Sequence, residues 1–229
     1  MTSLAHTSHP AEPMAVGSYR DATGTLQLLP YSQGEYERAI QAYQHRLGTC
    51  HFRTGEQVLV VSTFDESFQF GSLGRALQCF GLVLVSCDAS YFDAARSESC
   101  LRRFDISAVA GINAAVLDGL IALGHDPLKL LSGPVVWARP DAYERLAGEP
   151  GIRLRRWLDL GPAVAMECSH GLGAHIDRKE WQVTAEDGEI VLSSRFARAM
   201  DFANYRTGVR ATLDHSACAC GSADPRVVL

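Results

Sequence analysis

The sequence predicts an α/β fold: a mainly parallel sheet with flanking helices, followed by a smaller β-rich region. Residues 58–61 are all apolar, which is typical of a strand buried on both faces. Strand-length and helix-length apolar patterns alternate from there to about residue 150, and this alternation favours βαβ units. After residue 150 the pattern changes to short alternating strands and turns.

The first part of the chain leads into one helix. Residues 1–21 are polar and contain proline, so we expect them to be disordered or extended. Residues 22–29 predict a short strand and turn. Residues 32–47 carry apolar side chains on one helical face, with Ser32 as the N-cap and Glu35 completing a capping box.

The alternating segments follow in order. Strands are expected over residues 58–62, 82–86, 106–112 and 135–138. Helices are expected over residues 70–80, 92–104, 114–123 and 141–147. Ligands of parallel sheets bind at the carboxyl ends of the strands, where Asp65, Asp88 and Asn113 are expected to lie. Capping of the next helix is the commoner role of such residues.

The β-rich region begins at an alternating strand over residues 153–160. Residues 181–184 and 189–192 then predict a hairpin with Gly188 in its turn. No linker separates the regions, so we expect one domain over residues 22–229. Its α/β part covers residues 22–150, and its β-rich part covers residues 151–229.

Composition excludes several classes of function. The net charge of -5 does not favour nucleic acid or an anionic membrane as a partner. No apolar run is long enough to cross a bilayer, and the first residues do not form a secretion signal. Seven cysteines are an odd number, so reduced thiols in the cytoplasm are expected rather than a disulfide framework.

Three of the cysteines and one histidine form a candidate metal site. The set comprises Cys168, His175, Cys218 and Cys220. Four ligands with soft sulfur and nitrogen donor atoms suit a closed, structural zinc site. The alternative is free thiols and a surface histidine. His170 or His215 can replace His175 if the local register differs.

Five motifs occur in an order that resembles a known family. They are residues 161–168 (GPAVAMEC), 175–176 (HI), 187–192 (DGEIVL), 205–208 (YRTG) and 218–221 (CACG). Together they resemble the phenylacetate–CoA ligase branch of the adenylate-forming (acyl-CoA synthetase, AMP-binding) superfamily, over roughly residues 22–229. The resemblance implies zinc on the four residues above. It also implies adenylation of a carboxylic acid with ATP and magnesium, followed by transfer to a thiol.

The departures from that family concern its ATP site. The family's phosphate loop ends in Lys, but residues 21–26 (DATGTL) keep one Gly and have no Lys. Residues 154–158 stand where the family has its magnesium-binding Glu, and Val209 replaces its ribose-binding Asp. The family's C-terminal domain with the catalytic Lys is not found before Leu229. We therefore expect a truncated, degenerate member that does not use ATP or magnesium.

Three hypotheses remain. The favoured one is a pseudoenzyme that binds a small carboxylate or acyl thioester, or an acyl-carrier or ligase partner protein, plausibly in a biosynthetic pathway and with a homodimer as one assembly. The second is a repurposed enzyme for ATP-independent acyl transfer, cyclisation or hydrolysis, with His170, Glu167, Tyr205 and Arg206 as candidate catalytic residues. For these, the alternatives are that Glu167 orients a metal ligand, Tyr205 packs and Arg206 pairs with a carboxylate. The third is one half of a split ligase.

Overall fold

A nine-stranded sheet runs through the whole fold. The computed structural model describes residues 11–229. The strand order is β13-β14-β9-β8-β7-β6-β5-β3-β4. The bounds are β3 (Gln57–Ser62), β4 (Val83–Asp88), β5 (Ile106–Ile112), β6 (Val135–Ala138), β7 (Arg153–Leu160), β8 (Ala163–Glu167), β9 (Ala174–His175), β13 (Thr212–Asp214) and β14 (Arg226–Val228). Pairing is parallel from β4 to β7 and antiparallel from β7 to β13, so the sheet is mixed where a mainly parallel one was predicted.

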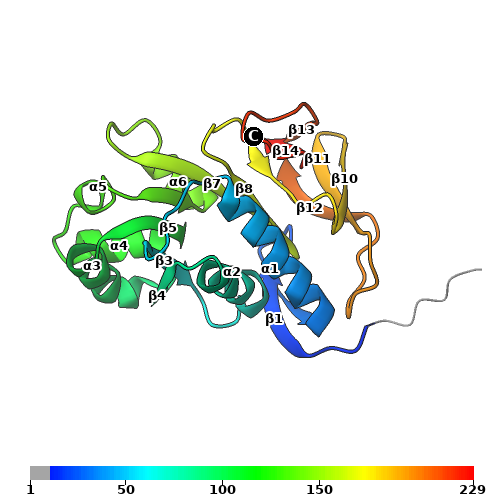
Figure 1. Ribbon diagram of the computed structural model, residues 1–229, viewed down its shortest axis with the longest axis horizontal. Coiled ribbons are helices and arrows are strands. Elements are labelled where there is room, and N and C mark those ends of the chain that lie inside the picture. Colours follow the sequence, from blue (N-terminus) through cyan, green and yellow to red (C-terminus); the bar gives the residue numbers. More distant parts are fainter. Residues whose placement is uncertain (1–10) are drawn as a thin grey trace, which may run out of the picture.

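Helices cover both faces of the parallel part (Figure 1). They are α1 (Gln33–Gly48), α2 (Ser67–Cys79), α3 (Ala94–Arg103), α4 (Ala114–Ala122), α5 (Pro127–Leu130) and α6 (Pro140–Leu146), with a 3₁₀ turn at Tyr91–Asp93. Val58 and Val60 share a core with α1 and α2, whereas Leu59 and Val61 share one with α3, α4 and α6. All four are at most 3% exposed, which explains why this strand is apolar throughout.

Local capping signals placed the starts of two helices correctly. Ser32 and Glu35 form the predicted capping box of α1, and Asn113 accepts a hydrogen bond from the Val116 amide at 3.0 Å to cap α4. The start of α2 lies three residues before the predicted one. Helix α5 was not predicted, although Asp126 caps it at the Leu128 amide.

The N-terminal hairpin corrects the expectation of disorder. Strand β1 (Ala15–Arg20) pairs antiparallel with β2 (Leu26–Tyr31), so residues 15–20 are extended and paired. The Ser18 amide and hydroxyl both donate to Asp65, which fixes β1 beside α2. The domain therefore includes residues that precede its predicted start at residue 22. Residues 1–10 lie outside the described part of the chain.

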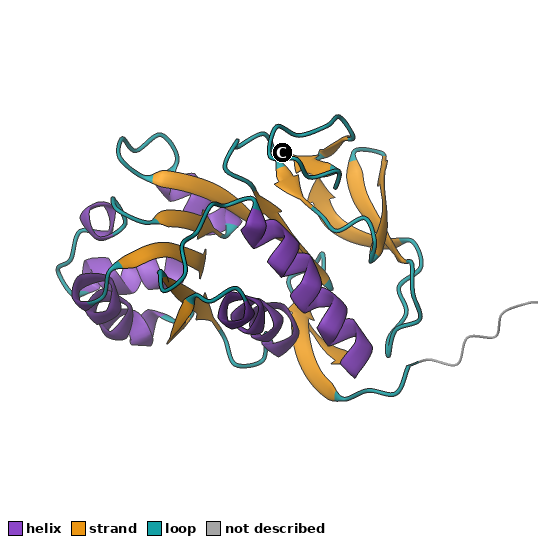
Figure 2. Cartoon of the chain, in the orientation of Figure 1, coloured by secondary structure: helices purple, strands orange, loops and turns teal. Residues whose placement is uncertain are grey.

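The β-rich part contains the predicted hairpin (Figure 2), and it shares its core with the rest of the fold. Strands β10 (Trp181–Glu186), β11 (Glu189–Ser194) and β12 (Tyr205–Arg210) form a three-stranded sheet. Asp187 and Gly188 link β10 to β11 with positive φ, as a two-residue hairpin loop requires. Its core cluster includes Leu29 of β2 and Phe68 of α2 as well as Leu158 and Ile190.

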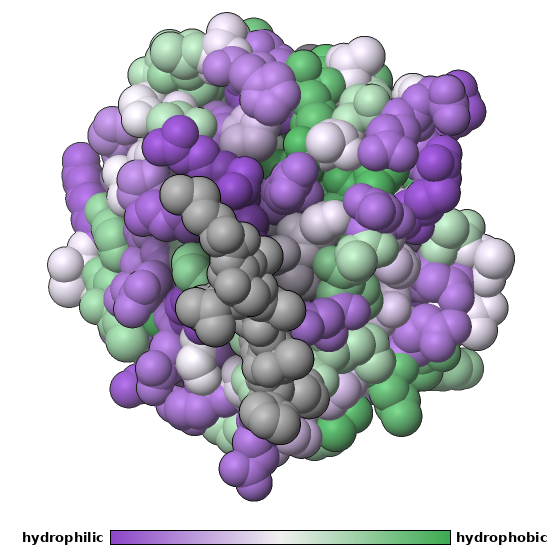
Figure 3. Space-filling view, turned by 90° about the vertical axis from the view of Figure 1, so that its right-hand side faces the viewer, coloured by the Kyte–Doolittle hydropathy of each residue, from purple (hydrophilic) through white to green (hydrophobic). Residues whose placement is uncertain are grey.

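Among the described residues, no helix combines the length and the apolar character needed to cross a bilayer. Hydrophilic and hydrophobic residues are interspersed on the face shown in Figure 3.

Candidate functional site

Four side chains from distant parts of the chain meet near the end of β8. The ligand atoms of Cys168, His175, Cys218 and Cys220 all lie within 4.8 Å of one another. The Cys168 and Cys218 sulfurs are 3.7 Å apart, and the Cys220 sulfur is 3.4 Å from the His175 Nε2. The structure thus brings together the four residues that the sequence nominated. His170 and His215 are exposed and do not belong to the cluster.

Backbone pairing positions these groups. Cys168 directly follows β8, and His175 lies on β9, which pairs with both β8 and β14. The loop from β13 to β14 supplies Cys218 and Cys220, and a turn at Gly221 is closed by a hydrogen bond to the Cys218 carbonyl. The Nδ1 of His175 is 3.0 Å from the Asp224 carbonyl, which leaves Nε2 to face the sulfurs.

The cluster is largely buried, and burial changes the protonation of its side chains. Cys168 and His175 are each 1% exposed. Burial raises the pKa of Cys168 to about 12, and it lowers the pKa of His175. For Cys218, burial acts to raise the pKa, but hydrogen bonds from Cys220 outweigh it and the pKa is lowered. A divalent ion would neutralise thiolates here, so the cluster can hold a metal with four protein ligands and no open coordination position.

The four candidate catalytic residues do not converge. Glu167 is buried, accepts a hydrogen bond from the Arg156 amide at 2.8 Å, and lies 3.7 Å from its guanidinium. Arg206 is half exposed and pairs with a carboxylate, Glu189, at 2.7 Å. Tyr205 packs in an aromatic cluster, and His170 faces solvent. Tyr205 therefore packs and Arg206 pairs with a carboxylate, which were the alternatives to a catalytic role for these two residues.

Residues 21–26, which the sequence resemblance matches to the family's phosphate loop, form the turn between β1 and β2 and the start of β2. The Asp21 carboxylate accepts hydrogen bonds from the Thr23 amide at 2.9 Å, the Thr25 amide at 3.1 Å and the Gln27 side chain at 2.7 Å. The Thr23 hydroxyl donates to it as well, and the Gly24 amide donates to the Asp21 carbonyl. The hydrogen bonds from Thr23 and Gln27 lower the pKa of Asp21 to about 2. The turn therefore directs its amides at its own carboxylate.

Strand β12 lies directly against this turn. A Cβ on Gly208 would be 2.6 Å from the Cβ of Ala22, so only glycine allows the contact. The next residue, Val209, packs on the core cluster of the β-rich part. No carboxylate occupies this position, in contrast to the family motif.

The sequence did not predict the ion cluster that lies at the carboxyl ends of the strands. Arg139 follows β6 and binds Glu66 through two contacts of 2.7 Å, with Asp159 of β7 at 3.4 Å. Burial raises the pKa of Asp159, although the arginine opposes this shift. Of the strand-end residues nominated above, Asp65 binds Ser18 and Asn113 caps α4. The sequence signal that could have identified Arg139 was its position directly after a predicted strand.

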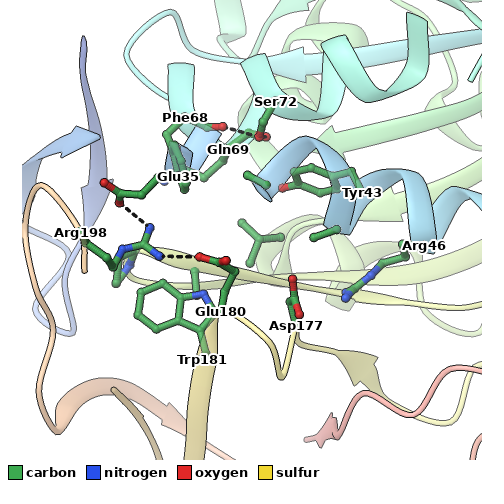
Figure 4. A pocket seen from close by; sticks show the side chains of 15 residues that line it. Glu35, Tyr43, Arg46, Phe68, Gln69, Ser72, Asp177, Glu180, Trp181 and Arg198 are labelled. Atoms are coloured by element: carbon green, nitrogen blue, oxygen red, sulfur yellow. Dashed lines mark hydrogen bonds and ion pairs between the residues drawn. The ribbon is translucent and has the colours of Figure 1, made fainter. Parts of the chain in front are cut away.

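A small cavity lies between α1, α2 and the segment that leads into β10 (Figure 4). Its volume is about 60 Å³. At one end Arg198 is 2.9 Å from Glu35 and 3.2 Å from Glu180, and its guanidinium lies 4.6 Å from the centre of the Trp181 ring. No periodic pattern in the sequence indicated this cavity.

Comparison with solved structures identifies the architecture. A 2-hydroxyisobutyryl-CoA ligase, solved in an open conformation with 2-HIB-AMP and CoA, superposes with a TM-score of 0.71 at 13% identity, over 94% of this chain and 56% of the ligase. The chain has the acyl-CoA ligase fold. A malonyl-CoA ligase complex gives 0.55 at 18% identity, over 98% of this chain and 54% of that one. Mycobacterium smegmatis MbtA gives 0.57 at 15%, over 99% and 47%.

The likeness is one of fold. The chain spans about half the length of these solved proteins. No protein-family model matches the sequence, and a comparison with curated proteins gave no match. The shared fold agrees with the fold that the sequence resemblance implied, whereas membership of the phenylacetate–CoA ligase branch stays a prediction.

Proposed function

We propose that this chain is a binding module with the acyl-CoA ligase fold, that a structural zinc ion ties its β-rich part, and that it does not adenylate a carboxylic acid. Its partner would be a small carboxylate or acyl compound, or a carrier or ligase protein. The observation that carries the proposal is the β1–β2 turn, whose amides bind the Asp21 carboxylate.

Charge makes this turn unsuitable for a nucleotide. A phosphate group would need the same amides that Asp21 already holds, and it would approach a carboxylate that stays ionised down to about pH 2. Two other positions point the same way. Val209 offers no acceptor for a ribose hydroxyl. Trp157 and Leu158, at the place of the magnesium motif, are buried in β7.

The repurposed enzyme receives less support. A general acid or base must lie within hydrogen-bond reach of the reacting group. Glu167 binds Arg156, Arg206 pairs with Glu189, and Tyr205 packs in an aromatic cluster, so each of the three has separate partners. His170 is exposed, and the four side chains do not form a catalytic set.

The decisive assay is ATP–pyrophosphate exchange with a panel of carboxylic acids. We expect no exchange above the buffer background from the metal-loaded chain, while a full-length acyl-CoA ligase in the same buffer gives a strong signal. Robust, substrate-dependent exchange by the isolated chain would contradict the proposal.

The state of the turn can be measured by itself. In an NMR titration we expect the Asp21 carboxyl group to titrate near pH 2, together with the Thr23 and Thr25 amides. The folded pKa lies below the ordinary value, so the turn is stabilised above about pH 4 and loses this stabilisation as the pH falls through about 2. Titration at the ordinary value of 3.8 would mean that the turn is open in solution and that its amides are free.

A further inference from the structure

The cavity beside α1 contains buried polar groups without partners. Gln69 is 7% exposed, and its side-chain oxygen accepts no hydrogen bond within residues 11–229. Its nitrogen donates to the Ser18 carbonyl at 3.1 Å, which fixes the orientation of the amide. Arg198 is 2% exposed, and its Nε donates to no described group. Buried groups of this kind are uncommon and indicate a missing partner.

A third polar group lines the same cavity. The Tyr43 hydroxyl points along the space between α1 and Arg198 (Figure 4) and makes no hydrogen bond in the described part of the chain. Burial raises the pKa of Tyr43, so the hydroxyl stays protonated and can both donate and accept. The cavity thus offers an acceptor on Gln69, a donor on Arg198 and a hydroxyl on Tyr43.

The charges around the cavity decide which group fits inside. The Arg198 guanidinium is already matched by Glu35 and Glu180, and Asp177 adds a further carboxylate. The second arginine of the lining, Arg46, donates to the His175 carbonyl and pairs with Asp224. An anion placed here would face these carboxylates at short range. A neutral hydroxyl or carboxamide would instead satisfy the unpartnered donor and acceptor.

The space outside this cavity favours an anion. A second cavity of about 340 Å³ shares Ala42, Asp177 and Glu180 with the first. It is also lined by three exposed basic residues that form no ion pair among the described residues, namely His45, Arg178 and Lys179. Two of its three carboxylates are occupied, because Glu180 pairs with arginines and Asp224 pairs with Arg46 at 3.4 Å. The third, Asp177, accepts a hydrogen bond from the Lys179 amide at 2.8 Å and forms no ion pair among the described residues.

We propose that the two cavities form one site for a small organic anion that ends in a neutral hydroxyl or carboxamide. The neutral end lies in the inner cavity on Gln69, Tyr43 and Arg198, and the anionic end lies on the basic residues outside. This site rests on the proposed binding role but not on the loss of adenylation. It contains none of the four metal-cluster residues and lies apart from the β1–β2 turn, although Gly221 and Asp224 of its outer cavity adjoin Cys220 and His175.

Binding can be tested by NMR on the metal-loaded chain with two probes, glycerol 3-phosphate and succinamate. These carry a hydroxyl with a phosphate and a carboxamide with a carboxylate. We expect saturable shifts of α1 amides with at least one probe, and roughly tenfold weaker binding of glycerol or succinamide. The stronger probe identifies the anion. Absence of saturable binding by both probes overturns the site, whatever the exchange assay shows.

Variants locate the two ends of the ligand. Tyr43→Phe keeps the packing and should weaken binding by roughly three- to tenfold, as expected for one hydrogen bond. The double variant Arg178→Ala/Lys179→Ala should weaken the anionic probe, leave its neutral counterpart unchanged, and reduce the salt dependence of binding. Lys129→Ala on α5 is the matched control for loss of an exposed charge. Unchanged affinity in both Tyr43→Phe and the double variant, with folding retained by circular dichroism, would refute the assignment.

Discussion

Removal of the metal should loosen the β-rich part and lower the melting temperature. The chain purified without chelator should contain about one zinc ion, because Cys168, His175, Cys218 and Cys220 supply four ligands within 4.8 Å. An ion present at 1,000 times its dissociation constant adds about 4 kcal/mol to the free energy of unfolding. For a chain of this size that corresponds to a fall in Tm of roughly 8–16 °C on chelation.

The position of the effect is as informative as its size. Hydrogen exchange should increase after residue 160, around β9 and β14, while β3 and β5 stay protected. Cys218→Ser should reproduce the chelated state, whereas Cys79→Ser removes an exposed thiol outside the cluster and should leave metal content and Tm unchanged. A purified chain without stoichiometric metal, or chelation without any change in Tm, would refute the metal site.

Replacement of Arg198 by methionine should be the most destabilising single charge removal. The substitution leaves Glu35, which is 1% exposed, and Glu180, which is 7% exposed, without their shared cation. Breaking a buried pair by removing one partner costs about 3–5 kcal/mol. Denaturant unfolding should show this loss as a lower midpoint with a similar slope.

Arg206→Met is the matched control because it removes the same charge at an exposed pair. Its partner Glu189 is also accessible to water, so the midpoint should stay close to that of the unmodified chain. Equal effects of the two substitutions would show that the Arg198 cluster is not buried in solution.

The sequence predicted the elements whose signals are local. The run at residues 58–61 predicted β3 because both of its faces are buried, and Ser32 with Glu35 predicted the start of α1 because the capping box lies within four residues. The four residues of the candidate metal site were also predictable, because the Cys-x-Cys pair and the order of the motifs are visible in the sequence. What placed them together, the pairing of β9 with β14, had no local signal.

The groups that sequence reasoning missed depend on contacts between distant segments. Arg198 lies in a loop without periodicity, and its partners come from α1 and from the residue before β10. Residues 15–20 were expected to be disordered or extended, and no local signal showed that they form a paired strand, because Asp65, which binds Ser18, lies about fifty residues later. The sequence around Asp21 did not indicate that its carboxylate binds the amides of its own turn.

The core of the β-rich part has a consequence for synthesis of the protein. Leu29 and Val227 belong to the same buried cluster. The candidate metal site is also incomplete until Cys218 and Cys220 have been synthesised. A nascent chain therefore exposes the inner side chains of β2 until nearly two hundred further residues have been made. Contacts this far apart in sequence form slowly, so the unfinished chain depends on being kept from aggregation during translation.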